Sequence, residues 1–118
     1  MKKHPIFSIL ILFSLFISSC KYDLVLPEVV PPVVKDVSFA TDIVPIFAAK
    51  CISCHSAQAP QLKADVAYSQ IVPKYVNTAT PESSVIYINA SSGKHYATVS
   101  ATQAAIILKW ITDGAKNN

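Results

Sequence analysis

Residues 50–57 read KCISCHSA, and within them Cys51, Cys54 and His55 form a Cys-x-x-Cys-His motif. Two thiols three positions apart, followed directly by an imidazole, can coordinate zinc, exchange a disulfide or attach a haem covalently. Each chemistry needs further ligands or a particular setting elsewhere in the chain, and these requirements distinguish the three.

Zinc and disulfide exchange are the weaker interpretations of the motif. A zinc site needs four protein ligands, or three and a water. The motif supplies at most three, and Cys54 and His55 are neighbours that would be strained in reaching one ion. Beyond residue 20 the chain adds only one more histidine, His95, and no further cysteine. A thioredoxin-like redox pair is expected in a βαβ setting, whereas the surrounding sequence is helical in pattern.

Covalent haem attachment fits the motif best. Positions i and i+3 of a helical turn project to the same side, so Cys51 and Cys54 can meet the two vinyl groups on one porphyrin edge. His55 follows directly and can place an imidazole nitrogen under the iron as proximal ligand. We therefore expect one covalently bound haem c, with its iron, per chain.

The first 19 residues have the features of a cleaved lipoprotein signal peptide. A cationic start precedes an apolar run from Ile6 to Ile17, which is shorter than the ~20 residues of a membrane-spanning helix. The run ends in ISSC, which resembles a bacterial lipobox, although that pattern prefers Leu where Ile17 stands and Gly or Ala where Ser19 stands. We expect lipidation of Cys20, and an uncleaved anchor or an ordinary secretory signal is the alternative.

The rest of the chain divides into a tether and one domain. Residues 20–37 contain three prolines and no helical period, which predicts an extended linker that follows the lipidated cysteine. Residues 38–118 form a domain near the lower size limit for a self-sufficient core, where a cofactor often contributes to stability.

Composition argues against nucleic acid as a partner. The whole chain has 10 Lys+Arg against 7 Asp+Glu, and every one of these cations is a lysine. No strongly basic face is therefore expected, and the arginine that usually clamps a phosphate is missing. Asp42, Asp65 and Asp113 stand where caps or surface residues are expected, and no acid–base set for substrate chemistry is present.

Two helices bracket the domain. Residues 38–50 place apolar side chains at helical spacing, and Thr41 or Asp42 can cap this first helix. The last helix follows Ser100, which opens the capping-box pattern SATQ, and Gly114 stands where a left-handed C-cap is wanted.

Two further helices are expected between them. Residues 64–71 form one that ends before Pro73. Residues 81–88 form the other, with Thr80 as cap and Pro81 in the first turn. The stretch VIYI suits a strand equally well, but the caps favour a helix, and the predicted fold class is all-α. The side chains expected to pack on a porphyrin are Phe39, Phe47, Leu62, Ile107, Trp110 and Ile111.

Residues 38–118 resemble the small monohaem cytochromes c of class I architecture, above all the lipoprotein-anchored bacterial members. The resemblance rests on the first helix, CISCH, the loop PQL at 60–62 and a terminal helix that ends in WITDGAKNN. It implies three to four helices around the haem. In that family the carbonyl of the loop proline often bonds the second nitrogen of the proximal histidine, and by resemblance Pro60 takes that role; an ordinary loop proline is the alternative.

The family commonly places a methionine on the far side of the iron, in the stretch before the last helix. Here the only methionine is Met1. The matching stretch contains His95, which we expect as distal ligand, with Lys94 and Tyr96 in reserve. Imidazole in place of the methionine sulfur lowers the reduction potential.

These ligands predict a single-electron carrier rather than an enzyme, because a six-coordinate iron has no open site. We expect a monomer in the bacterial cell envelope that is held to the lipid bilayer through Cys20 and exchanges electrons with redox proteins there. If His95 does not bind, the iron is five-coordinate, and a gas sensor or a peroxidase-like enzyme is the alternative.

Overall fold

The computed structural model describes residues 29–30, 32–33, 35–93, 95 and 99–118. The expected signal peptide and Cys20 lie outside the described residues, as do Lys94 and Tyr96. Every regular element in the described part is helical, which confirms the all-α class. None of the helices described is long and apolar enough to cross a bilayer.

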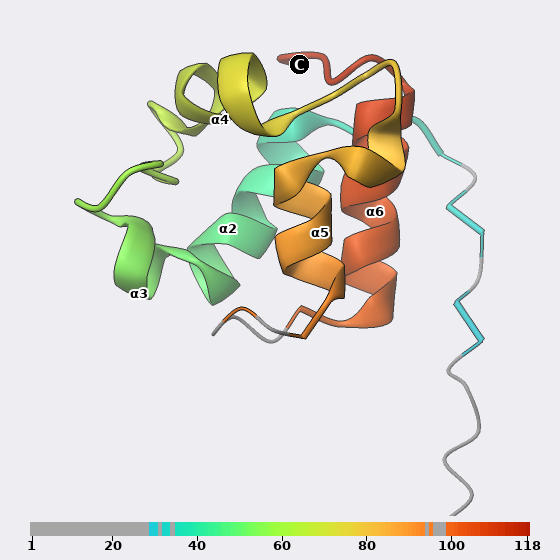
Figure 1. Cartoon of the computed structure of the whole chain (residues 1–118), viewed down its shortest axis with the longest axis horizontal. Helices are drawn as coiled ribbons and strands as arrows, with labels where there is room; N and C mark the ends of the chain where they lie inside the picture. Colours follow the sequence, from blue (N-terminus) through green and yellow to red (C-terminus); the bar gives the residue numbers. More distant parts are fainter. Residues whose placement is uncertain (1–28, 31, 34, 94, 96–98) are drawn as a thin grey trace, which may run out of the picture.

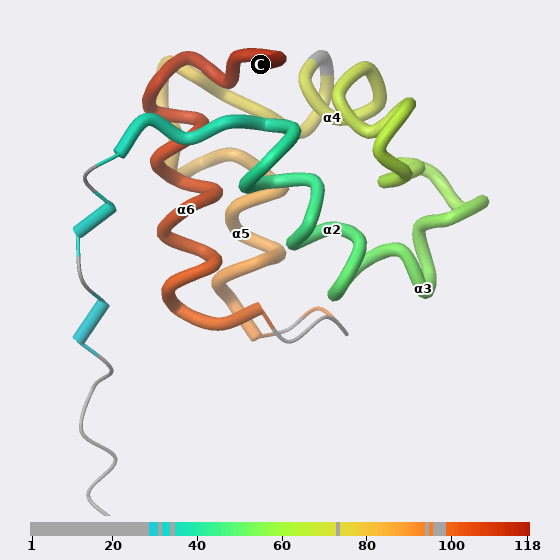
Figure 2. The backbone as a smooth tube through the Cα atoms, turned by 180° about the vertical axis from the view of Figure 1, so that it is seen from behind, coloured from blue at the N-terminus to red at the C-terminus, as the bar shows by residue number. Residues whose placement is uncertain are grey.

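The last helix, α6, contacts α5, η1 and η2, whereas α3 lies away from it beside α2 (Figures 1 and 2). α5 lies alongside α6, while the N-terminal turn η1 packs on α6 and α4 contacts α5. In chain order the elements are the π-helical turn η1 (Phe39–Ile43), α2 (Val44–Lys50), α3 (Ile52–His55), α4 (Ala67–Tyr75), the 3₁₀ turn η2 (Pro81–Ser83), α5 (Val85–Ser91) and α6 (Ala101–Thr112).

An aromatic cluster joins η1, α4 and α6 at the centre of the core. The ring centroid of Phe39 lies 5.2 Å from that of Tyr68 and 5.3 Å from that of Trp110. Phe39 and Trp110 are only 3% and 1% exposed. Large buried rings contribute much of the apolar area that a small core can remove from water, so this cluster sets how the two ends of the domain pack together.

The first helix begins at Phe39, and its N-cap is Ser38. The prediction that Thr41 or Asp42 caps this helix was wrong. The Ser38 hydroxyl accepts from the Thr41 N–H at 3.3 Å, and a carboxylate oxygen of Asp42 accepts from the Ser38 N–H at 2.9 Å. This reciprocal pair works like a capping box. The first turn is wide, because the Ile43 N–H reaches the Ser38 carbonyl five residues back, and Asp42 consequently lies inside the helix.

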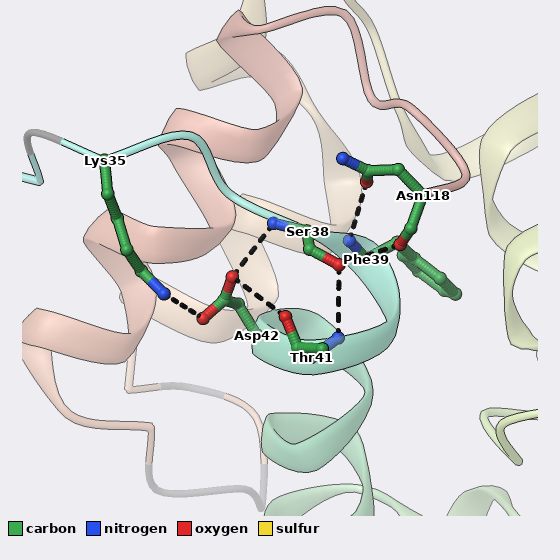
Figure 3. A network of polar contacts seen from close by, with 6 residues as sticks. All are labelled: Lys35, Ser38, Phe39, Thr41, Asp42 and Asn118. Carbon is green, nitrogen blue, oxygen red and sulfur yellow. Dashed lines mark hydrogen bonds and ion pairs between the residues drawn. The ribbon is translucent and has the colours of Figure 1, made fainter.

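Asn118 forms hydrogen bonds with the residues at the start of the same helix (Figure 3). The main-chain oxygen of Asn118 accepts from the Ser38 hydroxyl at 2.8 Å and from the Ala40 N–H at 2.9 Å. Its side-chain oxygen accepts from the Phe39 N–H at 3.0 Å. The first N–H groups of a helix have no partner within it, so Asn118 satisfies two of these donors and holds the two ends of the domain together.

The last helix is as predicted at both ends. Ser100 and Gln103 form the capping box, in which the Gln103 N–H donates to the Ser100 hydroxyl at 3.2 Å. Gly114 follows the helix with φ +96°, a conformation that glycine adopts without strain. The tail then turns back, and the Trp110 ring nitrogen donates to the Lys116 carbonyl at 2.9 Å.

The prediction that the second helix ends before Pro73 was wrong. α4 starts later, at Ala67, and continues through position 73 to Tyr75. A proline inside a helix lacks one N–H and costs about 3 kcal/mol. Ala67 and Ile71 are fully buried, and Tyr75 packs against the same core one turn further on. Burial of these three side chains offsets the cost of a proline inside the helix. Rules based on the proline and its sequence neighbours do not include this burial.

The third helix differs from its prediction because the chain breaks at Ser84. Thr80 and Pro81 start a turn as expected, but that turn is η2, and the α-helix begins at Val85. Ser84 is 1% exposed, and its hydroxyl accepts from the Asn77 N–H at 2.8 Å. The backbone of Ser84 is extended, and its side-chain hydrogen bond with Asn77 holds the loop that precedes η2 in place.

The end of the predicted linker is part of the folded domain. Val37 is 4% exposed and belongs to the core, and Val33 packs against it. An ion pair of 2.6 Å joins Lys35 to Asp42. The ordered domain therefore starts before residue 38.

Replacement of Asp42 by Asn is expected to lower stability at neutral pH by about 1 kcal/mol or less, because Lys35 is largely exposed. Hydrogen bonds from Lys35 and from the Ser38 N–H hold the pKa of Asp42 below its ordinary value of 3.8. A carboxylate with a depressed folded-state pKa stabilises the fold above its unfolded pKa, and that contribution is lost as pH falls through the folded value. Urea unfolding at several pH values should therefore show the difference at pH ~7 and its progressive loss as the pH falls below about 4.

The matched control is Asp36→Asn, which removes an exposed carboxylate that makes no ion pair or hydrogen bond with any described residue. It should change stability little at any of these pH values. Equal behaviour of the two variants would contradict the capping role of Asp42.

Candidate functional site

The Cys-x-x-Cys-His motif forms a helical turn, as predicted. The His55 N–H donates to the Cys51 carbonyl at 2.9 Å, and α3 runs from Ile52 to His55. Both thiols are free; Cys51 is half-buried and Cys54 is exposed. Burial raises the pKa of the Cys51 thiol. The motif thus presents two neighbouring thiols in different surroundings, one at the edge of the core and one in solvent.

The loop after the motif folds back onto His55. Its Nδ1 lies 2.9 Å from the Pro60 carbonyl oxygen, which is the contact that the resemblance implies. A carbonyl can only accept, so Nδ1 carries the hydrogen and Nε2 keeps the lone pair that can bind a metal. The Leu62 N–H donates to the His55 carbonyl at 2.8 Å, and the Leu62 side chain is 3% exposed. Leu62 therefore anchors the loop that orients His55.

A pocket of about 80 Å³, partly open to solvent, lies beside the motif. Cys51, His55 and Pro60 line it together with His95, while Cys54 does not. Its mainly apolar walls with a few polar groups are typical of the lining of a small-molecule or cofactor site. Of the six side chains predicted to pack on a porphyrin, Phe47, Leu62 and Ile107 line this pocket.

Phe39, Trp110 and Ile111 do not line the pocket, contrary to the prediction. They are buried in the core instead, because Trp110 joins the aromatic cluster with Phe39 and its ring nitrogen bonds the C-terminal tail.

The sequence reasoning missed the wall that α5 supplies. Val85, Ile86, Asn89 and Ala90 all line the pocket, and positions 85, 86, 89 and 90 repeat at the three- and four-residue spacing of one helix face. That spacing was visible in the sequence, but nothing local connected this helix with the motif. Two further lining residues were not predicted, namely Tyr75 at the end of α4 and Val99 before α6.

Both histidines line the pocket. Their rings are stacked, with centroids 5.9 Å apart and planes inclined by 29°. The nitrogen of an imidazole that binds a metal ion lies about 2 Å from it, so two rings at this separation can approach a single ion from the same pocket.

The histidines differ in how they are held. His55 is half-buried and bonded to Pro60, whereas His95 is exposed. Within the described residues, no group of three or more His, Cys, Asp or Glu side chains lies together to hold a metal ion. A structural zinc site takes four protein ligands, whereas a haem brings its own four nitrogens and takes only axial ligands from the protein.

Comparison of the chain with protein-family models, with curated proteins and with solved structures gave no match. Its function is therefore inferred from the residues of this site and from their geometry.

Leu62→Ala is expected to destabilise the protein by about 2–5 kcal/mol, because it removes a fully buried side chain and leaves a cavity beside the His55 loop. Leu108→Ala is the matched control, since Leu108 is only partly buried on α6 and should cost less than half as much. Urea unfolding of the protein as isolated measures both. Equal losses would contradict the anchoring role of Leu62.

Proposed function

We propose that residues 38–118 form a c-type cytochrome domain of class I architecture that carries single electrons through one covalently attached haem. The observation that supports this most strongly is that His55 and His95 line one mainly apolar pocket, with their ring centroids 5.9 Å apart. The CISCH motif on a helical turn at the edge of the same pocket adds the two thiols that covalent attachment needs.

Each residue of the site has a defined part in this proposal. Cys51 and Cys54 form the thioethers, and His55 and His95 are the proximal and distal iron ligands. When bound, the haem supplies a one-electron iron couple. The Pro60 carbonyl holds the hydrogen on Nδ1 of His55, which fixes the tautomer and makes Nε2 a better ligand.

The surroundings of the site suit electron transfer. Apolar side chains from α2, α5 and α6 line the pocket, and an apolar lining limits the reorganisation of polar groups when the charge changes. Two imidazoles favour the ferric state more than imidazole and methionine do, so the reduction potential is low within the range of c-type haems.

For the whole chain we propose an anchored protein of the bacterial cell envelope. Residues 1–19 are removed as a signal peptide, Cys20 carries the lipid, and the proline-rich linker separates the bilayer from the domain. The chain is a monomer that exchanges electrons with envelope redox proteins and has no enzymatic activity of its own.

His95→Ala should open the distal position. The reduced wild-type protein is expected to bind carbon monoxide slowly and incompletely, whereas the reduced variant should bind one equivalent rapidly. His95→Met should keep six coordination and raise the potential by on the order of 0.1 V, a part of the ~0.8 V range that axial ligands cover. Optical spectra and a redox titration measure these changes.

Asn89→Ala is the control, because Asn89 lines the same pocket and is not assigned as an iron ligand. It should behave as the wild type. Rapid stoichiometric binding of carbon monoxide by the reduced wild-type protein would contradict histidine ligation by His95 and would indicate the five-coordinate gas sensor or peroxidase-like enzyme instead.

A further inference from the structure

The last part of the predicted linker lies along the outside of α6 (Figures 1 and 2). This part, which we call the strap, consists of the described residues 29–30, 32–33 and 35–37. Val37 is 4% exposed in the core, and Val33 packs against that core. Val30 and Pro32 line a surface groove together with Leu108 of α6. The strap is therefore part of the folded domain and not of a free tether.

The strap runs from beyond the end of α6 to the start of that helix. At one end, the Ser38 hydroxyl donates to the main-chain oxygen of Asn118, which follows α6. At the other end, Val30 lines a second groove with Val99 and Ala101, which stand at the start of α6. The polypeptide that precedes the strap therefore joins the domain beside the start of α6.

The composition of the strap suits stable docking. The valines at positions 30, 33 and 37 are at least partly buried, whereas Val29 is 90% exposed. Removal of the buried valine side chains from water favours the docked arrangement. Pro32 has a fixed φ, so the segment loses less conformational entropy on docking than a more flexible segment would.

Val99 connects the strap with the candidate site. Its side chain lines the groove that Val30 lines and also lines the pocket that contains His95. Val99 is half-buried and packs against the core. A change at Val30 therefore reaches the wall of the pocket through one side chain.

The position of His95 depends on how its own segment packs. The His95 ring is exposed and, within the described part of the chain, contacts the His55 ring but forms no hydrogen bond. His55, in contrast, is held by the Pro60 carbonyl. Val99, four residues after His95, is the next described residue in the chain, and it anchors this segment to the core.

We propose that the strap is a positioning element of the site, because its docking on α6 completes the groove around Val99 and so holds His95 at the pocket. This inference rests on the proposed function for the role of His95 as an iron ligand. Release of the strap lowers the fraction of molecules in which His95 is in place, and the apparent affinity of His95 for the iron falls in proportion. The tether and the distal ligand are thereby linked.

The experiment compares Val30→Asn with Val29→Asn in the haem-loaded protein. Both variants introduce the same polar side chain at neighbouring positions, but Val30 lines the groove and Val29 is exposed. Binding of carbon monoxide to the reduced protein, followed by stopped flow, reports how often His95 leaves the iron. Val30→Asn should bind carbon monoxide about fivefold faster than the wild type, and Val29→Asn should match the wild type.

Val37→Ala separates this effect from a loss of overall stability. It removes buried apolar volume at the other end of the strap, so urea unfolding should show a clear loss of stability while the carbon monoxide rate stays that of the wild type. Equal rates in Val30→Asn and Val29→Asn, or the same increase in Val37→Ala as in Val30→Asn, would overturn the positioning role.

Amide hydrogen exchange tests the same role without reference to the iron. The peptide that contains His95 and Val99 should exchange faster in Val30→Asn than in Val29→Asn, and equal exchange would overturn the inference. If the wild-type protein binds carbon monoxide rapidly or carries no covalent haem, and exchange still differs between the two variants, the proposed function fails while the positioning of residue 95 by the strap is supported.

Discussion

The contact between His55 Nδ1 and the Pro60 carbonyl fixes the orientation of the imidazole at the pocket. It places the hydrogen on Nδ1 and leaves Nε2 with its lone pair. The geometry depends on a short loop whose ends are joined by the Leu62 N–H and the His55 carbonyl, and on burial of the Leu62 side chain. An imidazole fixed in this way can lie beside a second one in the pocket with a defined separation.

The tightly packed core between the terminal segments and the pocket with the candidate site lie in different parts of the domain. Phe39 and Trp110 pack together in the core, and Asn118 bonds the start of η1, so the terminal segments close one side of the domain. The pocket lies between α2, α3 and one face of α5, and neither α3 nor α5 contains a fully buried residue. In a domain this small, a bound cofactor that fills the pocket adds core volume where the polypeptide supplies least.

Sequence reasoning succeeded where the signal was local. The helical turn at CISCH, the capping box at Ser100 and the glycine at 114 each depend on a few neighbouring residues. It failed where contacts between residues far apart in the sequence determine the structure. The helix α4 continues through position 73 because Tyr75 packs against the core. The pocket wall from α5 also went unpredicted, because it depends on tertiary packing. For the distal position, the sequence offered His95 with Lys94 and Tyr96 in reserve, and the structure adds the separation of the His95 ring from that of His55.

Covalent attachment of haem is the central claim, and it can be tested directly on the purified protein. The protein is denatured and extracted with acidified organic solvent, and the pigment is then measured as its pyridine haemochrome. The account predicts that the colour stays with the polypeptide at one haem per chain, and that a C51A/C54A variant retains none after the same extraction. Pigment that leaves the wild-type chain, or that was never bound to it, would contradict the account.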